Sequence, residues 1–268
     1  MLTSTPIAMK GSAQRIHRVL STYLSLGNRA QAAEGAIVVT NPEFPLLLQA
    51  NLVHSIRLGD HQDAVQFLDR AVALLRAGGS RRLHMMLDPD TRPEELGALL
   101  VDAGFQPQAW ISQSYASAPQ VEVHTRVEVR GIAEKSAWGQ FRELRRDILA
   151  AEGHTGEELD QLAALARRRS LSSNVRYYLA LLDFEPVGHI GLLSVGRTGM
   201  LVDLAVRPDR RRSGLARALI RKMVEQSRSL GHDLCCVVHE DREPLNDLFR
   251  SMGFESASSY TSYVWQRA

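Results

Sequence analysis

Residues 199–216, GMLVDLAVRPDRRRSGLA, constrain the fold of this chain more than any other stretch. An apolar run that favours an extended strand leads into a loop rich in arginine and glycine. Helical spacing begins directly behind this loop, at Leu215, and continues to about Ser229. The first amides of a helix have no partner inside it and lie beside the positive end of its dipole. Because Gly214 and the small Ala216 let an anion approach the backbone closely, the pattern predicts a phosphate site between strand and helix.

The order of residue types in this loop is more specific than an isolated run of arginines, which is usually a solvated turn. Valine-x-proline at Val206-Arg207-Pro208 precedes arginine-x-x-glycine-x-small at residues 211–216. This order closely resembles the acyl-coenzyme A pyrophosphate loop of the GNAT acyltransferase superfamily, and the resemblance covers roughly residues 124–268. It implies pantetheine contacts from the main chain of Leu204, Ala205 and Val206. It also implies a pyrophosphate held by the amides of Arg211, Arg212, Ser213, Gly214, Leu215 and Ala216.

The second half of the chain has the periodicity of a mixed α/β domain. Strands are predicted at residues 124–129, 177–183, 187–195, 200–206, 234–239 and 260–265, and helices at 134–151, 157–169 and 215–229. Glu185-Pro186 is expected to form the turn between the second and third strands. A last short helix has Asp241 as its expected N-cap, Pro244 in its first turn and Gly253 at its end.

The first half repeats the last part of this pattern. We expect a strand at residues 51–58, a helix at 64–76, a strand at 83–87, a helix that carries Pro93 and ends at Gly104, and a strand at 110–115. In place of the arginine-glycine loop, residues 57–63 contain one glycine and two acids, a poor cradle for phosphate. Similarity at so large an offset favours duplicated domains, although two unrelated α/β segments with similar helix caps are the alternative.

The predicted fold class is α/β, which some schemes name α+β. It comprises two GNAT-like domains, each a mixed, mostly antiparallel sheet flanked by helices. Residues 1–118 are expected to be a degenerate GNAT-like domain without a cofactor loop, and residues 119–268 the complete acyltransferase domain. The boundary is expected at residues 116–120, which contain Pro119.

The residues that complete catalysis in GNAT enzymes differ here. The family often places a tyrosine four residues before the Gly-Phe pair, where it protonates the leaving thiolate, but this position is Phe249. The asparagine often found six residues before that tyrosine is Glu243. Other donors for the thiolate are Ser251, Tyr260, Tyr263 or a water, and a thiolate is a good enough leaving group to depart without an acid.

Three residues are candidates for the catalytic base: Asp203, His239 and Glu240. Asp203 lies three residues before Val206 on the predicted cofactor strand, and its carboxylate could act through water. His239 ends the next strand, and a histidine that titrates near neutrality suits deprotonation of an amine. The alternatives are structural: an aspartate that pairs with an arginine, and a capping or surface histidine.

Composition excludes several other classes of protein. The hydrophobic content of 44% and charged content of 23% are typical of a soluble globular chain. No apolar run approaches the roughly 20 residues of a membrane span, and the N-terminal stretch lacks the apolar core of a signal peptide, so a cytoplasmic location is expected. The only cysteines are the adjacent Cys235 and Cys236, which allow neither a disulfide framework nor a CxxC metal site.

The predicted function is N-acyl transfer from acetyl-CoA, or another acyl-CoA, to a primary amine of a small molecule or protein, with no metal required. The main alternative is a non-catalytic acyl-CoA-binding regulatory or interaction module. The formal net charge of +2, with no aromatic residues among the arginines, argues against a nucleic-acid partner. A homodimer remains open.

Overall fold

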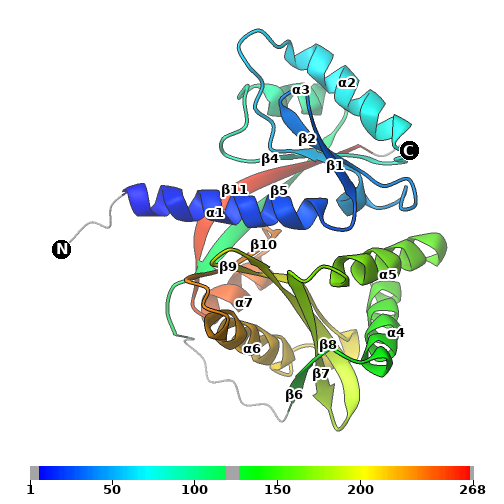
Figure 1. The fold of residues 1–268 in the computed structure, drawn as a ribbon, viewed down its shortest axis with the longest axis vertical. Coiled ribbons are helices and arrows are strands. Elements are labelled where there is room, and N and C mark those ends of the chain that lie inside the picture. Colours follow the sequence, from blue (N-terminus) through cyan, green and yellow to red (C-terminus); the bar gives the residue numbers. More distant parts are fainter. Residues whose placement is uncertain (1–5, 119–126, 266–268) are drawn as a thin grey trace. The chain divides into compact units, whose positions relative to one another are not determined.

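The computed structural model describes residues 6–118 and 127–265, which form two compact units (Figure 1). The first unit contains Met1–Val19 and Ser112–Ala257, and the second contains Leu20–Ile111 and Ser258–Ala268. Half of the strand predicted at 124–129, and two residues of the predicted boundary at 116–120, lie outside the described residues. The domain division at residue 118 stays a prediction.

The sheet of the first unit has the strand order β5-β10-β9-β8-β7-β6. Strands β6 to β9 pair antiparallel, whereas β9 and β10 pair parallel and are connected by a helix. The strand bounds are β5 Gln106–Tyr115, β6 Glu128–Gly131, β7 Val175–Leu182, β8 Glu185–Val195, β9 Thr198–Val206 and β10 Leu234–Glu240.

Helices pack on both faces of this sheet. Successive side chains of a strand point to opposite faces, and here both faces carry apolar side chains that the helices cover. Tyr178 belongs to the apolar cluster that contains Leu219 and Met223 of α6, whereas the neighbouring Tyr177 contacts Phe141 of α4. The helix bounds are α4 Lys135–Ala151, α5 Gly156–Ser170, α6 Leu215–Ser229 and α7 Glu243–Ser251, with α1 at Pro6–Ser25 and a 3-10 turn η2 at Pro208–Arg210. None of the helices in the described residues has the length and apolar character that a bilayer crossing requires.

The second unit has the strand order β1-β2-β3-β4-β11, with β3 and β4 parallel. Its last strand comes from the other end of the chain, because Thr261–Trp265 of β11 pair with Leu83–Leu87 of β4. The first unit in turn takes its β5 residues from Ser112 onward. The bounds are β1 Arg29–Ala33, β2 Ala36–Thr40, η1 Leu48–Ala50, β3 Leu52–His54, α2 Ala64–Ala77, β4 Leu83–Leu87, α3 Leu96–Asp102 and β11 Phe254–Trp265.

Two local predictions are wrong. The turn before β8 is formed by Asp183 and Phe184, whose φ angles of 49° and 67° suit a two-residue hairpin, and Glu185 already belongs to the strand. The last helix has Arg242 as its N-cap, and Asp241 precedes the cap. The Asp241 carboxylate accepts from the side-chain amide of Asn246 and, among the described hydrogen bonds, does not cap a main-chain amide of the helix.

Other elements differ in length from prediction or match it. The strand predicted at 51–58 ends at His54, since Ser55 takes a φ of 54°. The predicted helix at 215–229 and strand at 83–87 are confirmed to the residue. The sequence reasoning proposed no elements for α1, β1 and β2.

Gly191 tests the packing between β7, β8 and β9. A Cβ atom there would lie 2.7 Å from Cγ2 of Val202 and 3.0 Å from Cε1 of Tyr177. We expect Gly191→Ala to lower the free energy of unfolding by about 1–3 kcal/mol, because a packed interior must move to admit a methyl group. Gly139→Ala in α4 is the matched control, since a Cβ there meets no atom within 4 Å and should be neutral or stabilising. An equal loss of unfolding free energy in the two variants, measured by thermal or urea unfolding, would contradict tight packing around Gly191.

Candidate functional site

Strands β9 and β10 stop pairing before either strand ends. Their parallel register runs from Thr198 opposite Leu234 to Leu201 opposite Val237. Beyond that point, residues 202–206 of β9 and 238–240 of β10 continue without pairing to each other. We call this feature the divergence, and its closed end at Leu201 and Val237 the apex. Because unpaired strand backbone is a row of hydrogen-bonding groups, the divergence can bind an extended ligand along β9.

A β-bulge on the other edge of β9 accompanies the divergence. His189 pairs with Ala205 and Gly191 with Val202, so Asp203 and Leu204 together oppose a single residue of β8. Asp203 has a φ of 52°, a conformation that non-glycine residues rarely adopt. Bulges bend a strand and redirect side chains, and they are frequent beside active sites.

The peptide groups of Val206 face the open edge of β9. The Arg207 amide donates to the Val187 carbonyl of β8 over 2.9 Å, so the groups of the preceding residue point away from β8. Consistent with this, the Val206 carbonyl accepts a hydrogen bond of 3.2 Å from Nε of Arg211. Ala205 pairs with β8 and Leu204 lies in the bulge. The pantetheine contacts of all three residues stay a prediction.

The loop between β9 and α6 presents amide groups that have no acceptor. Among the described hydrogen bonds, the amides of Arg212, Ser213 and Gly214 donate to none. Gly214 is the N-cap of α6 with a φ of 84° and no capping side chain, and Arg212 has a φ of 65°. The next amides belong to the first turn of α6 and have no intrahelical acceptor. Successive amides in such a conformation, beside a helix N-terminus, form an anion-binding concavity.

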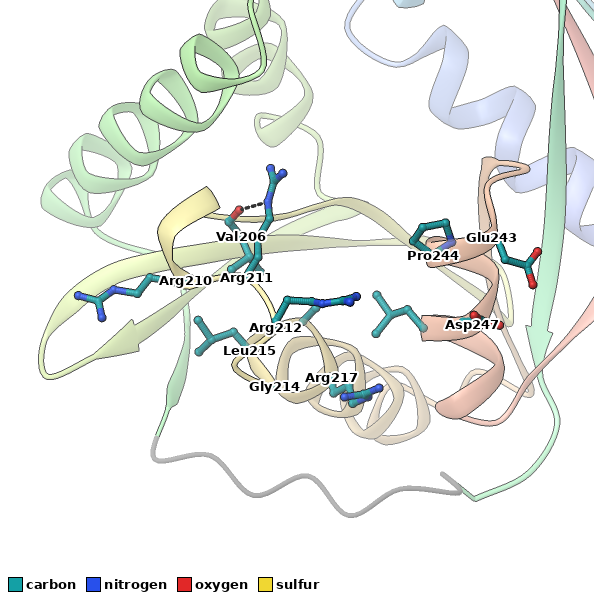
Figure 2. Close-up of a pocket in the computed structure, with 12 residues that line it drawn as sticks. Val206, Arg210, Arg211, Arg212, Gly214, Leu215, Arg217, Glu243, Pro244 and Asp247 are labelled. Carbon is teal, nitrogen blue, oxygen red and sulfur yellow. Dashed lines mark hydrogen bonds between the residues drawn. The ribbon is translucent and has the colours of Figure 1, made fainter.

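This loop borders a cavity of about 450 Å³ (Figure 2). The loop and the first turn of α6 line one side, and the first turns of α7, including Glu243, Asp247 and Leu248, line the other. Arg211 and Arg212 both border the cavity. Arg211 forms an ion pair of 2.6 Å with Glu152 at the end of α4, whereas Arg212 forms no ion pair among the described residues. The cavity therefore combines free amides and positive charge on the loop side with acidic and apolar residues on the α7 side.

Residues 138–254 match the model of the acetyltransferase (GNAT) family. These residues belong to the GNAT family. The match contains the divergence, the amide-lined loop and α7, which are the features described above. The sequence has no significant match among proteins with curated descriptions.

Solved structures resemble the whole chain in fold. GCN5-related N-acetyltransferases from Kribbella flavida and Sphaerobacter thermophilus have TM-scores of 0.67 and 0.66 at 14% and 12% identity; the alignments cover 96% of this chain in both cases, and 96% and 90% of those chains. A tandem GNAT protein from the clavulanic acid biosynthesis pathway has a TM-score of 0.50 at 13% identity, covering 80% of this chain and 74% of that chain. This likeness confirms the predicted fold class. Family and fold together support acyl transfer as the general chemistry of the GNAT domain.

Asp203 lies in a partly buried cluster on the α4 face of the GNAT domain. Its Oδ2 atom accepts a hydrogen bond of 2.7 Å from the Tyr177 hydroxyl, and its Oδ1 atom is 3.7 Å from Nη2 of Arg145. The arginine side chain is 9% exposed and the aspartate side chain 16% exposed. An ion pair with an arginine was the structural alternative for Asp203, and the pair is present; a catalytic role stays a prediction.

His239 occupies the unpaired end of β10, on the opposite arm of the divergence from Asp203. Its Nδ1 atom is 2.7 Å from the Glu240 carbonyl and its Nε2 atom is 3.0 Å from the side chain of Gln113. The ring stacks on Phe249 at 5.0 Å, and burial lowers the pKa of the imidazole. Both ring nitrogens are thus engaged by protein atoms. Catalysis by His239 stays a prediction, and this environment suits a structural histidine as well.

The residues considered as thiolate donors occupy different places. Phe249 is buried against His239 and Phe254, so its position contributes packing. The Ser251 hydroxyl donates to the Leu248 carbonyl over 2.7 Å and lies 3.4 Å from Nε of Arg217. Tyr260 and Tyr263 are buried residues of the second unit, the latter in that unit's apolar cluster. Glu240, the third candidate base, forms an ion pair with Arg242.

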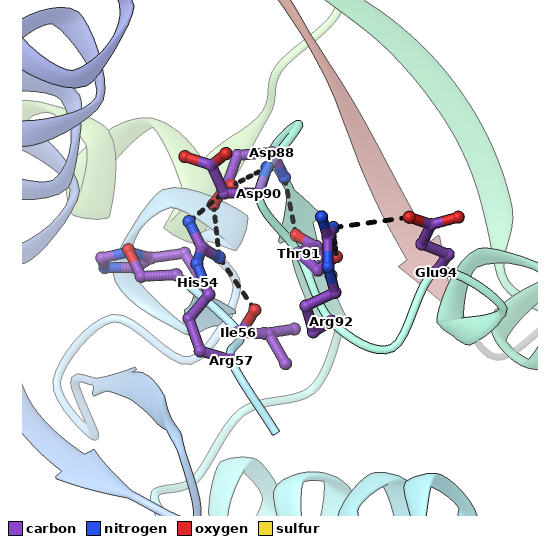
Figure 3. A network of polar contacts seen from close by, with 9 residues as sticks. His54, Ile56, Arg57, Asp88, Asp90, Thr91, Arg92 and Glu94 are labelled. Atoms are coloured by element: carbon purple, nitrogen blue, oxygen red, sulfur yellow. Dashed lines mark hydrogen bonds and ion pairs between the residues drawn. The ribbon is translucent and has the colours of Figure 1, made fainter. Parts of the chain in front are cut away.

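In the corresponding loop of the second unit, side chains of the loop accept hydrogen bonds from nearby main-chain amides. The Asp63 carboxylate caps α2 by accepting from the Gln66 amide over 2.9 Å, and the Gly59 amide donates to Oε1 of Gln62 over 2.8 Å. The Arg57 guanidinium donates to the two oxygens of Asp88 over 2.7 and 3.1 Å, and Figure 3 shows it pointing at this carboxylate. Asp63 therefore occupies the start of α2, and Asp88 neutralises Arg57, at the two positions that would otherwise attract an anion.

Sequence reasoning missed Tyr177, Arg145 and Glu152. The two residues beside Asp203 come from β7 and α4, and Glu152 reaches the loop from the end of α4. Strand register and helix docking bring them together, and neither leaves a local sequence signal. The acids of α7 at positions 243 and 247 were detectable, because their spacing of four places them on one helix face.

Acid sensitivity tests the burial of His189, which packs against Phe141 in the same cluster. Burial, assisted by the positive charge of Arg145, lowers the pKa of His189 to about 3. The unfolded chain binds this proton near pH 6.5, so stability falls as pH drops from about 6.5 toward 3, by at most about 1.4 kcal/mol per pH unit. We expect His189→Phe to reduce this slope in urea unfolding between pH 7 and pH 4.5. His84, whose pKa burial lowers to about 4, should leave a residual slope. An unchanged slope would show that His189 titrates normally.

Proposed function

We propose that this protein transfers an acyl group, acetyl in the simplest case, from acyl-CoA to a primary amine of a small molecule or a protein. The observation that carries this proposal is the loop at residues 211–216. The unpaired amides of residues 212–214, the N-cap at Gly214 without a capping side chain, and the Arg212 guanidinium, which forms no ion pair among the described residues, together suit a diphosphate. The loop adjoins the open edge of β9, on which an extended amide-bearing chain can pair.

In the proposed complex, the amides of residues 212–216 hold the pyrophosphate and the main chain of residues 204–206 pairs with pantetheine. The Arg211 amide donates to the Pro208 carbonyl over 3.3 Å, so it joins the pyrophosphate site only if this bond opens. The thioester then lies toward the apex of the divergence, between the arms that carry Asp203 and His239. Arg211 now donates to the Val206 carbonyl, so pantetheine binding at that carbonyl requires this side chain to move. An amide donor beside the thioester carbonyl stabilises the oxyanion, usually the largest contribution to acyl transfer.

The acceptor ammonium gives a proton to a base, either Asp203, His239 or a water, and the neutral nitrogen attacks the thioester carbonyl carbon. The new C–N bond forms and the C–S bond breaks, releasing the thiolate. The second amine proton passes to this thiolate, directly or through water, so the products are an amide, coenzyme A thiol and one proton. Holding the two substrates together supplies much of the rate.

One acyl-CoA site per chain is expected, in the proposed GNAT domain of residues 119–268. The proposed degenerate domain of residues 1–118 has no matching loop, because Asp63 caps its helix and Asp88 neutralises Arg57. A carboxylate already bound at a helix start repels a phosphate.

Calorimetric titration with acetyl-CoA tests the site. We expect one site per chain, and Gly214→Glu should abolish binding, because it places a carboxylate among the phosphate-binding amides and strains a φ of 84°. Gly59→Glu is the matched control in the second unit: a Cβ there meets only Oε1 of Gln62, at 3.7 Å, and binding should be unchanged. Two sites, no site, or equal effects of both substitutions would refute the assignment.

A non-catalytic acyl-CoA-binding module is the second candidate, favoured by the buried ring of Phe249 where a proton donor is frequent in the family. A panel of primary amines separates the two functions, with n-butylamine, spermidine and a dipeptide amide as probes. Release of coenzyme A thiol with formation of an amide supports the enzyme. Binding of acetyl-CoA without any amide product across the panel supports the binding module.

A further inference from the structure

The carboxylate of Asp203 is held in one orientation by groups from two other elements. Tyr177 of β7 donates to Oδ2 over 2.7 Å, and Arg145 of α4 lies 3.7 Å from Oδ1. The backbone of the bulge adds a third restraint, since the φ of 52° directs the side chain out of the regular alternation of β9. A carboxylate with this degree of restraint is suited to bind a charged group in a defined position.

Its place along β9 gives the carboxylate a part in the proposed reaction. Asp203 lies two residues beyond the apex at Leu201 and three residues before Val206, at the start of the divergent backbone. At about 3.3 Å per residue, this is about 10 Å from the end of β9 that adjoins the phosphate loop. A chain anchored at that loop and extended along β9 toward the apex therefore ends near Asp203. In the proposed complex, the reacting end of the acyl-CoA therefore comes close to the Asp203 carboxylate.

Tyr177 is itself fixed by aromatic neighbours. Its ring centroid lies 5.2 Å from that of Phe141 and 6.0 Å from that of Trp138, both on α4, and the residue is only 2% exposed. A rigid ring gives the hydroxyl a fixed direction, so the hydrogen bond to Asp203 is formed before any ligand arrives. The adjacent Tyr178 faces the α6 side of the sheet and has no part in this contact.

We propose that Tyr177 is a positioning residue, whose hydroxyl holds the Asp203 carboxylate so that it binds the ammonium group of the acceptor beside the thioester. This inference rests on the proposed function and narrows it to acceptors that arrive as cations. An ionised carboxylate has about four lone-pair sites, so Asp203 can accept from an N–H donor in addition to the Tyr177 hydroxyl and the nearby Arg145. The positive charge of Arg145 offsets part of the negative charge of Asp203, which lowers the free-energy cost of burying the carboxylate.

Steady-state kinetics with acetyl-CoA and n-butylamine, spermidine or a dipeptide amide test this inference. Loss of a hydrogen bond to a charged group corresponds to about a tenfold effect or more. We expect Tyr177→Phe to raise KM for the fastest of these amines by about that factor, with the Kd for acetyl-CoA unchanged. Tyr178→Phe, the neighbouring control, should change neither quantity.

A double-mutant cycle separates positioning from a general loss of structure. Asp203→Asn should raise KM for the amine at least as much as Tyr177→Phe, and the double variant should be no worse than Asp203→Asn alone, because the hydroxyl acts only through the carboxylate. Thermal unfolding of each variant checks folding, and if Tyr177→Phe does not fold, Asp203→Asn alone decides whether the carboxylate binds the amine.

The outcomes are distinct for the two proposals. Transfer by the wild-type protein with an unchanged KM in Tyr177→Phe, or with additive effects in the double variant, overturns the positioning role. An unchanged KM in Asp203→Asn overturns the ammonium contact. Failure of the wild-type protein to bind acetyl-CoA or to acylate any of these amines refutes the proposed amine transfer, and the inference falls with it.

Discussion

The parting of β9 from β10 after Leu201 and Val237 is the constraint on which the candidate site depends. Two parallel strands joined by α6 would normally satisfy each other's peptide groups along their whole length. Here the antiparallel pairing with β8 continues to Val206, so β9 is held on one edge and open on the other. The bulge at Asp203 bends β9 at the same level. The apolar face of α6 then fixes the helix start at the end of the open edge, which places unpaired amides in line with unpaired strand backbone.

The two units share a similar arrangement of strands and helices, but they differ in whether the helix start can bind an anion. Each has a parallel strand pair connected through a helix, β9 with β10 in one and β3 with β4 in the other. In the GNAT domain, glycine caps the helix and leaves the amides available, whereas in the second unit Asp63 caps α2 and Asp88 pairs with Arg57. A carboxylate at the N-cap accepts from a helix amide and repels a second anion, whereas a glycine N-cap does neither.

The polar groups around the divergence are held to different degrees. His239 has both ring nitrogens engaged and its ring stacked, so it is tied into the packing of β10 and α7. Asp203 is restrained by Tyr177 and Arg145 but keeps 16% of its side chain exposed. The greater exposure of Asp203 favours this residue, on β9, as the group that contacts the proposed acceptor. His239, on β10, is then a structural residue.

Three local features follow from the amino-acid pattern alone: strand β9, the loop at 211–216, and the start of α6 at Leu215 with Gly214 before it. These depend on neighbouring residues, through capping, periodicity and glycine φ angles. The other features of the site arise from the packing of distant segments. This packing placed the last strand of the chain beside β4, set the register that brings Tyr177 to Asp203, and closed His239 between Gln113 and Phe249. The hydrogen bonds of Tyr177 with Asp203 and of His239 with Gln113 join residues 26 and 126 positions apart, and they depend on register and packing, which a local pattern does not encode.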